Sequence, residues 1–198
     1  MKKLILTLSV LTLAFSAFAQ NISGGLKAGL NFANQDISSS GISLDTKSKL
    51  GFQAGAFLTV MFNEKMGLQP EILYSMQGSE LDIDGSDGTF NFNYLNIPVL
   101  FRYNITDMIN LHAGPQIGML LSAELESDGD TEDVKDSFKG SDFGLAVGGG
   151  VDLPMGLGFG ARYTFGLSKI ADDPDFWDGD WSNSAFQLYA SYKLFGKK

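Results

Sequence analysis

The sequence contains no cysteine. Disulfides, thiolate metal sites and cysteine nucleophiles are therefore excluded. Lipid anchoring after export is excluded as well, because a lipoprotein carries its acyl chains on a cysteine at the cleavage site. If the chain is exported, it either remains free or is held in a membrane by its own fold.

Long hydrophobic runs are missing after residue 20. A membrane-spanning helix needs about 20 consecutive apolar residues, and no later stretch approaches that length. A helical membrane protein is therefore excluded. A transmembrane β-barrel is not, because its alternating strands average to a low hydropathy.

Positive charge is scarce, since 14 lysines and arginines face 23 acidic residues and the formal net charge is -9. Loss of the two lysines in the first 19 residues would make it -11. Nucleic-acid affinity depends on Lys and Arg neutralising phosphates. We therefore expect no nucleic-acid partner.

Residues 1–19 are expected to be a cleavable signal peptide. Two lysines open this segment, an apolar stretch follows over 4–18, and Ala-Phe-Ala at 17–19 supplies the small-x-small pattern that a signal peptidase reads. The alternative is an N-terminal anchor, but the apolar run is shorter than a spanning helix needs. Cleavage before Gln20 leaves residues 20–198 as one domain.

Apolar and polar residues alternate with a period of two along the rest of the chain, as in β-strands with one apolar face. The alternating segments are 26–32, 50–60, 68–77, 95–103, 109–124, 142–153, 157–168 and 186–194. They exceed the mean soluble strand of about 5–6 residues, and most reach the roughly 9–11 residues needed to cross a bilayer on a tilt. Phe90 and Phe92 have the opposite parity to the segment that follows, which predicts a bulge or bend near Tyr94.

The connections between these segments alternate in length. Three are tight, at 63–65, 104–107 and 154–155, and four are long and polar, at 34–47, 82–89, 126–137 and 171–182. Outer-membrane barrels show such short periplasmic turns and long extracellular loops. The sequence therefore predicts an all-β fold, an eight-stranded antiparallel up-and-down transmembrane β-barrel in the outer membrane. A soluble sandwich or lipocalin-like barrel would alternate equally, with its apolar face inside, but the loop lengths and long strands favour the membrane.

Five short stretches carry a family resemblance: 24–31 (GGLKAGLN), 69–75 (QPEILYS), 94–98 (YLNIP), 161–167 (ARYTFGL) and 192–195 (YKLF). Through them the chain resembles the PorT-like "porin family" of outer-membrane β-barrel domain proteins from Gram-negative bacteria. Its architecture is also similar to the OmpA and OmpX barrels. The resemblance implies contacts with outer-membrane lipid and lipopolysaccharide, and insertion by the barrel-assembly machinery. The group often has an acidic residue where this chain has Asn96.

Charged residues of inward parity form a candidate lumen cluster of Glu71, Arg102 and Arg162, with Lys193 and Glu124 sharing that parity. Glu71 and Arg102 fall on neighbouring strands, and we expect them to pair. Buried charges are tolerated only when paired, so a structural plug is favoured over a gate for a narrow water path.

The sequence predicts no catalytic, cofactor or metal site. His112, the single histidine, falls near a periplasmic turn without a partner for acid–base chemistry. The acidic loop that begins at Asp82 lacks the twelve-residue calcium-loop pattern, because its twelfth position is Asn93 and not the Glu that would bind calcium. The glycines at 148–150 fit close packing and not a phosphate loop, since no helix follows them. We therefore expect a protein that is not an enzyme.

Two functions remain open. The first is a structural or surface-interaction role through the acidic extracellular loops, with Trp177 and Trp181 as contact candidates that could stack on a sugar, grip a partner or anchor at the interface. The second is a narrow channel, or a transport or secretion accessory, using the polar lumen. The sequence does not specify a surface ligand.

Overall fold

The computed structural model describes residues 21–39, 42–44, 47–83, 86–127, 130–170 and 180–196. The predicted signal peptide lies outside these residues, as do Trp177 and the side chain of Trp181.

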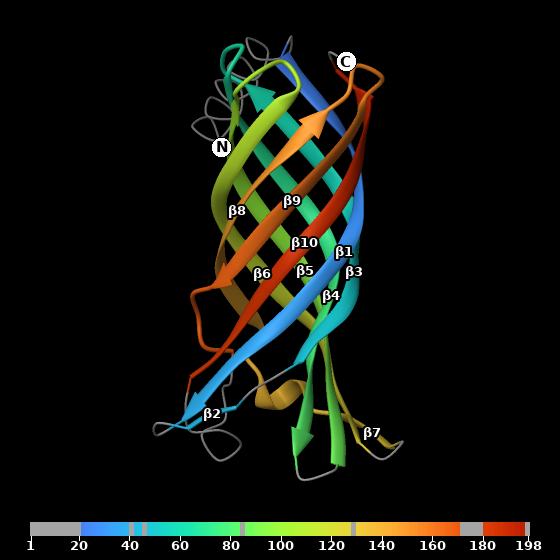
Figure 1. Ribbon diagram of the computed structural model, residues 1–198, viewed down its shortest axis with the longest axis vertical. Coiled ribbons are helices and arrows are strands. Elements are labelled where there is room, and N and C mark those ends of the chain that lie inside the picture. Colours follow the sequence, from blue (N-terminus) through green and yellow to red (C-terminus); the bar gives the residue numbers. More distant parts are fainter. Residues whose placement is uncertain are drawn as a thin grey trace, which may run out of the picture.

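Long strands wind around a common axis and close into a barrel (Figure 1). The wall consists of β1 (Ile22–Ser39), β3 (Lys47–Met61), β4 (Met66–Ile83), β5 (Ser86–Asn104), β6 (Ile109–Ser127), β8 (Ser141–Asp152), β9 (Leu157–Gly166) and β10 (Asp180–Phe195). Each pairs antiparallel with the next, and β10 pairs with β1 to close the sheet. The prediction of an eight-stranded up-and-down barrel is confirmed.

Three small elements lie at one end of the wall: β2 (Ile42–Leu44) pairs with β1, β7 (Asp130–Asp133) pairs with β6, and the 3-10 helix η2 (Lys135–Ser137) follows β7. Within the described residues, no helix is long and apolar enough to cross a membrane. Closure explains how strands alone can cross, because every backbone N–H and C=O in lipid needs a partner and a closed sheet has no unpaired edge.

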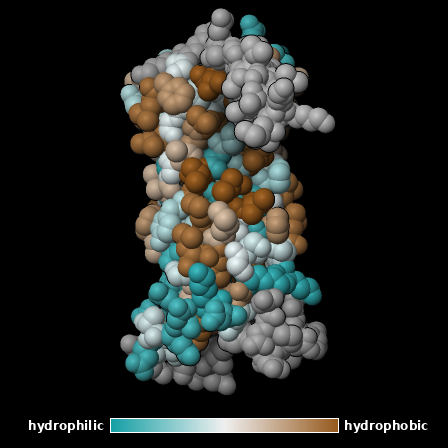
Figure 2. All heavy atoms as spheres, turned by 180° about the vertical axis from the view of Figure 1, so that it is seen from behind, coloured by the Kyte–Doolittle hydropathy of each residue, from teal (hydrophilic) through white to brown (hydrophobic). Residues whose placement is uncertain are grey.

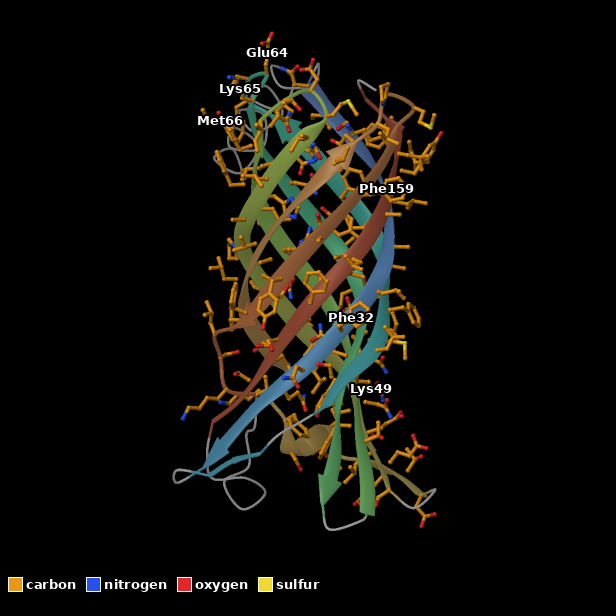
Figure 3. The ribbon with its side chains drawn as sticks, viewed as in Figure 1. Phe32, Lys49, Glu64, Lys65, Met66 and Phe159 are labelled. Atoms are coloured by element: carbon orange, nitrogen blue, oxygen red, sulfur yellow. The ribbon has the colours of Figure 1, made fainter. Side chains whose placement is uncertain are left out.

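The three tight connections and the N- and C-terminal ends of the wall lie at the upper end in Figure 1, which we call the turn rim. Figure 3 places Glu64, Lys65 and Met66 there. Asn63 Oδ1 accepts backbone N–H bonds of 2.9 and 2.8 Å from two and three residues ahead, and Thr106 Oγ1 accepts equivalent bonds of 3.2 and 2.9 Å. Such bonds let Asn and Thr hold a turn without a longer loop. The opposite end is the loop rim.

The outer wall between the rims is an apolar belt (Figure 2). Leu50, Leu111 and Phe159 are 60, 51 and 53 % exposed, while polar side chains such as Gln53 and Gln187 are 1 % exposed inside the barrel. A water-soluble barrel would bury the apolar face and expose the polar one. The outward apolar face therefore belongs in lipid, and the soluble alternative is excluded.

Val147 lies half-way along β8 on this outward face and is 43 % exposed. We expect Val147→Arg to lower the free energy of unfolding by about 2–4 kcal/mol, because it places a charge near the bilayer midplane. Leu167→Arg, just beyond the loop-rim end of β9, is the matched control and should cost only about 0–1 kcal/mol. Urea titration of the barrel refolded in lipid vesicles measures both; equal costs would contradict the depth assignment.

The bulge predicted near Tyr94 is present, but Phe90 and Phe92 do not change face across it. Both side chains point inward and are buried, with the same parity as Tyr94 and the rest of β5. These residues belong to a part of β5 that runs on toward the loop rim, where the barrel interior is apolar. Large apolar side chains therefore indicate the inner face here, whereas they indicate the outer face within the belt.

A register irregularity does occur beside Tyr94, but the extra residue belongs to β6. Asn93 pairs with Ser122, and Tyr94 pairs with Leu120, so Leu121 is additional. The bulge reverses the inward parity of β6, since both Leu120 and Ala123 are buried. A bulge of this kind bends the strand and re-aims its side chains, and here it directs Ala123 into the buried apolar cluster near the loop rim.

Candidate functional site

The middle of the lumen contains an ionic cluster of Lys27, Glu71 and Arg162, contributed by the inward faces of β1, β4 and β9. Arg162 donates two parallel hydrogen bonds to the Glu71 carboxylate, Nη1 to Oε2 at 3.0 Å and Nη2 to Oε1 at 2.9 Å. Lys27 Nζ forms an ion pair with Glu71 Oε1. The side chains of all three are at most 2 % exposed. The cluster therefore crosses the lumen away from solvent and joins three separate strands.

Further contacts compensate the charges of this cluster. Gln69 Nε2 donates a 2.7 Å hydrogen bond to Glu71 Oε1. The ammonium of Lys27 lies 4.2 Å from the ring centroid of Tyr189, and the guanidinium carbon of Arg162 lies 5.5 Å from the same centroid. An aromatic face attracts a desolvated cation, and additional hydrogen bonds are what make a buried ion pair tolerable.

A second charged group, the turn-rim cluster, consists of Arg102, Asp152 and Lys193. Arg102 Nη2 forms an ion pair with Asp152 Oδ2, and Lys193 Nζ lies 3.5 Å from the same oxygen. Arg102 also donates to Gln69 Oε1 at 3.1 Å and to Asn104 Oδ1 at 3.0 Å. The side chains of the turn-rim cluster are 10 to 19 % exposed, so this cluster lies closer to water than the ionic cluster.

The predicted pairing of Glu71 with Arg102 is wrong. The residue opposite Arg102 on β4 is Gly67, four positions before Glu71, which is a displacement of roughly 13 Å along an extended strand. The β4–β5 hairpin pairs as far as Ile83 and Ser86, and this register carries the two charges apart. Arg102 and Arg162 are nevertheless both inward-facing, as predicted, and Gln69 connects their clusters.

The prediction that Glu124 faces the lumen is wrong, because its side chain is exposed. The β6 bulge lies between it and the belt, and its side chain is exposed near the loop rim, where its backbone pairs with Asp133. Lys193 does face inward, as its parity indicated, and is part of the turn-rim cluster. Parity therefore assigned faces correctly up to the first irregularity in a strand and failed beyond it.

His112 is buried beside the ionic cluster, 3.4 Å from Arg162 Nε through its Nε2 atom and 3.3 Å from Asn110 Oδ1 through Nδ1. Glycines on β8 and β9 make room for it and for Tyr189. A Cβ atom at Gly148 would lie 2.8 Å from His112 Nε2, and one at Gly160 would lie 2.3 Å from the Tyr189 hydroxyl. The glycine run therefore serves close packing of the lumen.

An apolar plug closes the lumen toward the loop rim. Phe92 packs edge-to-face on Phe138 with ring centroids 4.8 Å apart, and stacks on Phe90 at 6.0 Å. Edge-to-face and offset-stacked rings are favourable arrangements for aromatic pairs. The plug comprises Phe90, Phe92, Tyr94, Leu120, Ala123, Val134, Phe138 and Ile170.

Backbone hydrogen bonds fasten the plug to the wall. Val134 N–H donates to Ala123 O at 3.0 Å, and Lys139 N–H donates to Ile170 O at 2.8 Å. Segment 134–140 is therefore folded across the mouth of the barrel. The prediction of a polar loop over 126–137 did not include this plug. Two large apolar residues within an acidic stretch, Val134 and Phe138, were the available signal.

Beyond the plug, the end of β6 and strand β7 form an acidic hairpin, residues 124–127 and 130–133. Its exposed carboxylates belong to Glu124, Glu126, Asp130, Glu132 and Asp133. Among the residues that the structure describes, no group of three or more histidines, cysteines or acids is arranged to hold a metal ion. The hairpin is thus a strip of solvated negative charge on the loop rim.

Small outer-membrane barrels have an apolar belt on the outer wall, a lumen filled by polar side chains, and long loops at one end only. Over residues 18–172, the chain matches the model of the outer membrane protein beta-barrel domain family. It belongs to that family. The match covers every wall strand except β10, and membership places this barrel in the outer membrane.

Solved structures of other small barrels share the fold. The attachment invasion locus protein Ail of Yersinia pestis is 20 % identical, with 88 % of this chain and 99 % of that chain covered and a TM-score of 0.52. Neisserial surface protein A is 12 % identical, with 86 and 97 % covered and a TM-score of 0.60. No curated protein matches the chain. At these identities the likeness concerns the fold alone.

This outer-membrane barrel therefore has two charged clusters and one apolar plug in line along its lumen. Among the described residues, small voids lie between them, and two of these voids each have about 10 Å³ of free volume for a water-sized sphere. One lies among Gln77, Gln116 and Thr164 on the loop-rim side, and the other lies between Lys27 and Arg102 on the turn-rim side. Neither void has room for a substrate-sized molecule.

Proposed function

We propose that this outer-membrane barrel is not an enzyme and acts at the cell surface, with the acidic hairpin as its principal contact. The observation that carries the proposal is the contrast between its interior and its rim. The lumen is closed at two levels, by the ionic cluster and by the plug, while the hairpin presents unburied carboxylates beyond the belt. The loop rim faces outside in this proposal, because outer-membrane barrels keep their short turns in the periplasm.

The charge of the hairpin favours a cationic partner. The solved Ail structure is a complex with the heparin analogue sucrose octasulfate, a polyanion. Carboxylates such as those of Glu126 and Glu132 would repel a ligand of that kind, since like charges across an interface oppose binding. We therefore propose that this barrel binds a basic protein surface. Trp177 and Trp181 remain contact candidates from the sequence.

Binding of oligolysine and of heparin to the barrel, held in nanodiscs of neutral lipid, tests the proposal. We expect oligolysine to bind in a salt-sensitive manner, and Glu126→Gln/Glu132→Gln to weaken it about fivefold. The matched control is Glu64→Gln/Asp107→Asn, which removes equal charge from the turn rim and should leave binding unchanged. A preference for heparin, or equal losses in both variants, would contradict the proposal.

The alternative is a narrow channel, or an accessory in transport or secretion, that uses the polar lumen. The two water-sized voids flanking the ionic cluster are the observation in its favour. They are separated by three buried side chains, so passage would require the ionic cluster to come apart. Bilayer recordings distinguish this alternative from the surface role.

A further inference from the structure

The lumen has more positive than negative charge from the ionic cluster to the turn rim. Among the described residues this part of the lumen contains four cationic side chains and two carboxylates, an excess of two positive charges. The cations are Lys27, Arg102, Arg162 and Lys193, and the carboxylates are Glu71 and Asp152. Unbalanced charge in a low-dielectric interior is costly. A counter-ion bound inside the barrel would relieve that cost.

The second void lies between these cations. It separates the ionic cluster from the turn-rim cluster, and its free volume of about 10 Å³ accommodates one sphere of the size of water. Its polar lining consists of Lys27, Gln69, Arg102, Asn110, Tyr189 and Ser191, together with the carboxylate of Asp152. Most of these side chains can donate hydrogen bonds, as an anion requires.

Donors remain available on the two buried cations. The guanidinium of Arg102 has five N–H groups, and three of its nitrogen atoms each donate one hydrogen bond, to Gln69, Asn104 and Asp152. The ammonium of Lys27 has three N–H groups and makes one hydrogen bond to an oxygen, that of Glu71, besides its ring contacts. Lys27 is 3 % exposed and Arg102 is 8 % exposed, so bulk water solvates neither fully.

We propose that this void is a binding site for one small monovalent anion of the halide class, held between Lys27 and Arg102. A halide is close to water in size, whereas phosphate or sulfate would not enter. Asp152 opposes the anion, but its charge is shared by Arg102 and Lys193. The site thus combines local positive charge, buried donors and a cavity of the right size.

Bromide provides a direct structural test. Crystals of the intact barrel equilibrated with sodium bromide should show one anomalous peak in the void between Lys27 and Arg102. Water in the void without an anomalous peak would overturn the proposal. A peak only on the outer surface would mean an adventitious ion only and would overturn it as well.

A solution test measures affinity with the same probe. The urea midpoint of the barrel in neutral lipid vesicles should rise saturably as bromide replaces gluconate, a monovalent anion too large for the void, at constant ionic strength. Arg102→Gln should abolish that rise, and Lys65→Gln, on the exposed first turn, should leave it unchanged. If Arg102→Gln fails to fold, Asp152→Asn still decides, because removing the opposing carboxylate should lower the half-saturating bromide concentration roughly tenfold. No change, or weaker binding, in Asp152→Asn would contradict an anion at this position.

Discussion

Glu71→Gln should lower the free energy of unfolding by about 3–5 kcal/mol, the largest effect we expect from any single substitution in the lumen. The amide keeps the shape of the side chain but removes the one negative charge in contact with Lys27 and Arg162. Two fully buried cations then face each other without compensation. Urea titration in lipid vesicles measures the loss.

The comparison variants separate charge from packing. Asp152→Asn removes a partly exposed carboxylate from the turn-rim cluster and should cost about 1 kcal/mol or less, as pairs near solvent do. Replacing the whole ionic cluster by apolar residues of similar volume, Lys27→Met/Glu71→Leu/Arg162→Met, should recover most of the stability lost in Glu71→Gln. A Glu71→Gln barrel as stable as the wild type would show that the cluster is not a stabilising unit.

Planar-bilayer recordings of the wild-type barrel should be nearly silent. Eight strands give an interior that side chains can fill, whereas open pores use sixteen or more. The plug and the ionic cluster block the lumen at different depths, so opening should require both to be weakened. We expect Phe92→Ala/Phe138→Ala to stay closed, and the same variant with Glu71→Gln to show frequent small openings.

The outcomes distinguish the two functions. Large and stable conductance from the unmodified barrel would overturn the surface role and favour the channel. Openings in Phe92→Ala/Phe138→Ala alone would show that the plug is the only barrier. Phe52→Ala, on the lipid-facing wall, is the control for loss of aromatic volume and should leave the recordings silent.

The barrel itself could be predicted because its determinants are local. Period-two alternation reports which face a residue takes, and the contrast between tight turns and long loops orders the strands. The assignment of faces from apolar residues failed beyond the belt, where the inner face of the barrel becomes apolar. Phe90 and Phe92 continue the inward parity of β5 beyond the belt, and an apolar residue there indicates the interior and not lipid.

Several members of the candidate site could be predicted, but their pairing could not, and Lys27 and Asp152 were missed. Inward parity identified Glu71, Arg102 and Arg162, yet it carries no information about contacts across the lumen. Glu71 meets Arg162 from β9 and Lys27 from β1, and these neighbours depend on the tilt and stagger of the closed sheet. Alternation places Lys27 on the inner face, but nothing local set it apart from other inward residues.

The seam between β1 and β10 determines when this barrel can form. The two strands pair from Gly24 with Phe195 to Ser38 with Asp180, so the first part of the wall joins the last. Contacts between residues so distant in sequence form slowly, and until they form, both strands present unpaired edges that invite aggregation. An exported chain would therefore have to cross the periplasm unclosed. That interval, and not the life of the finished barrel, is when proteolysis and misassembly can act on it.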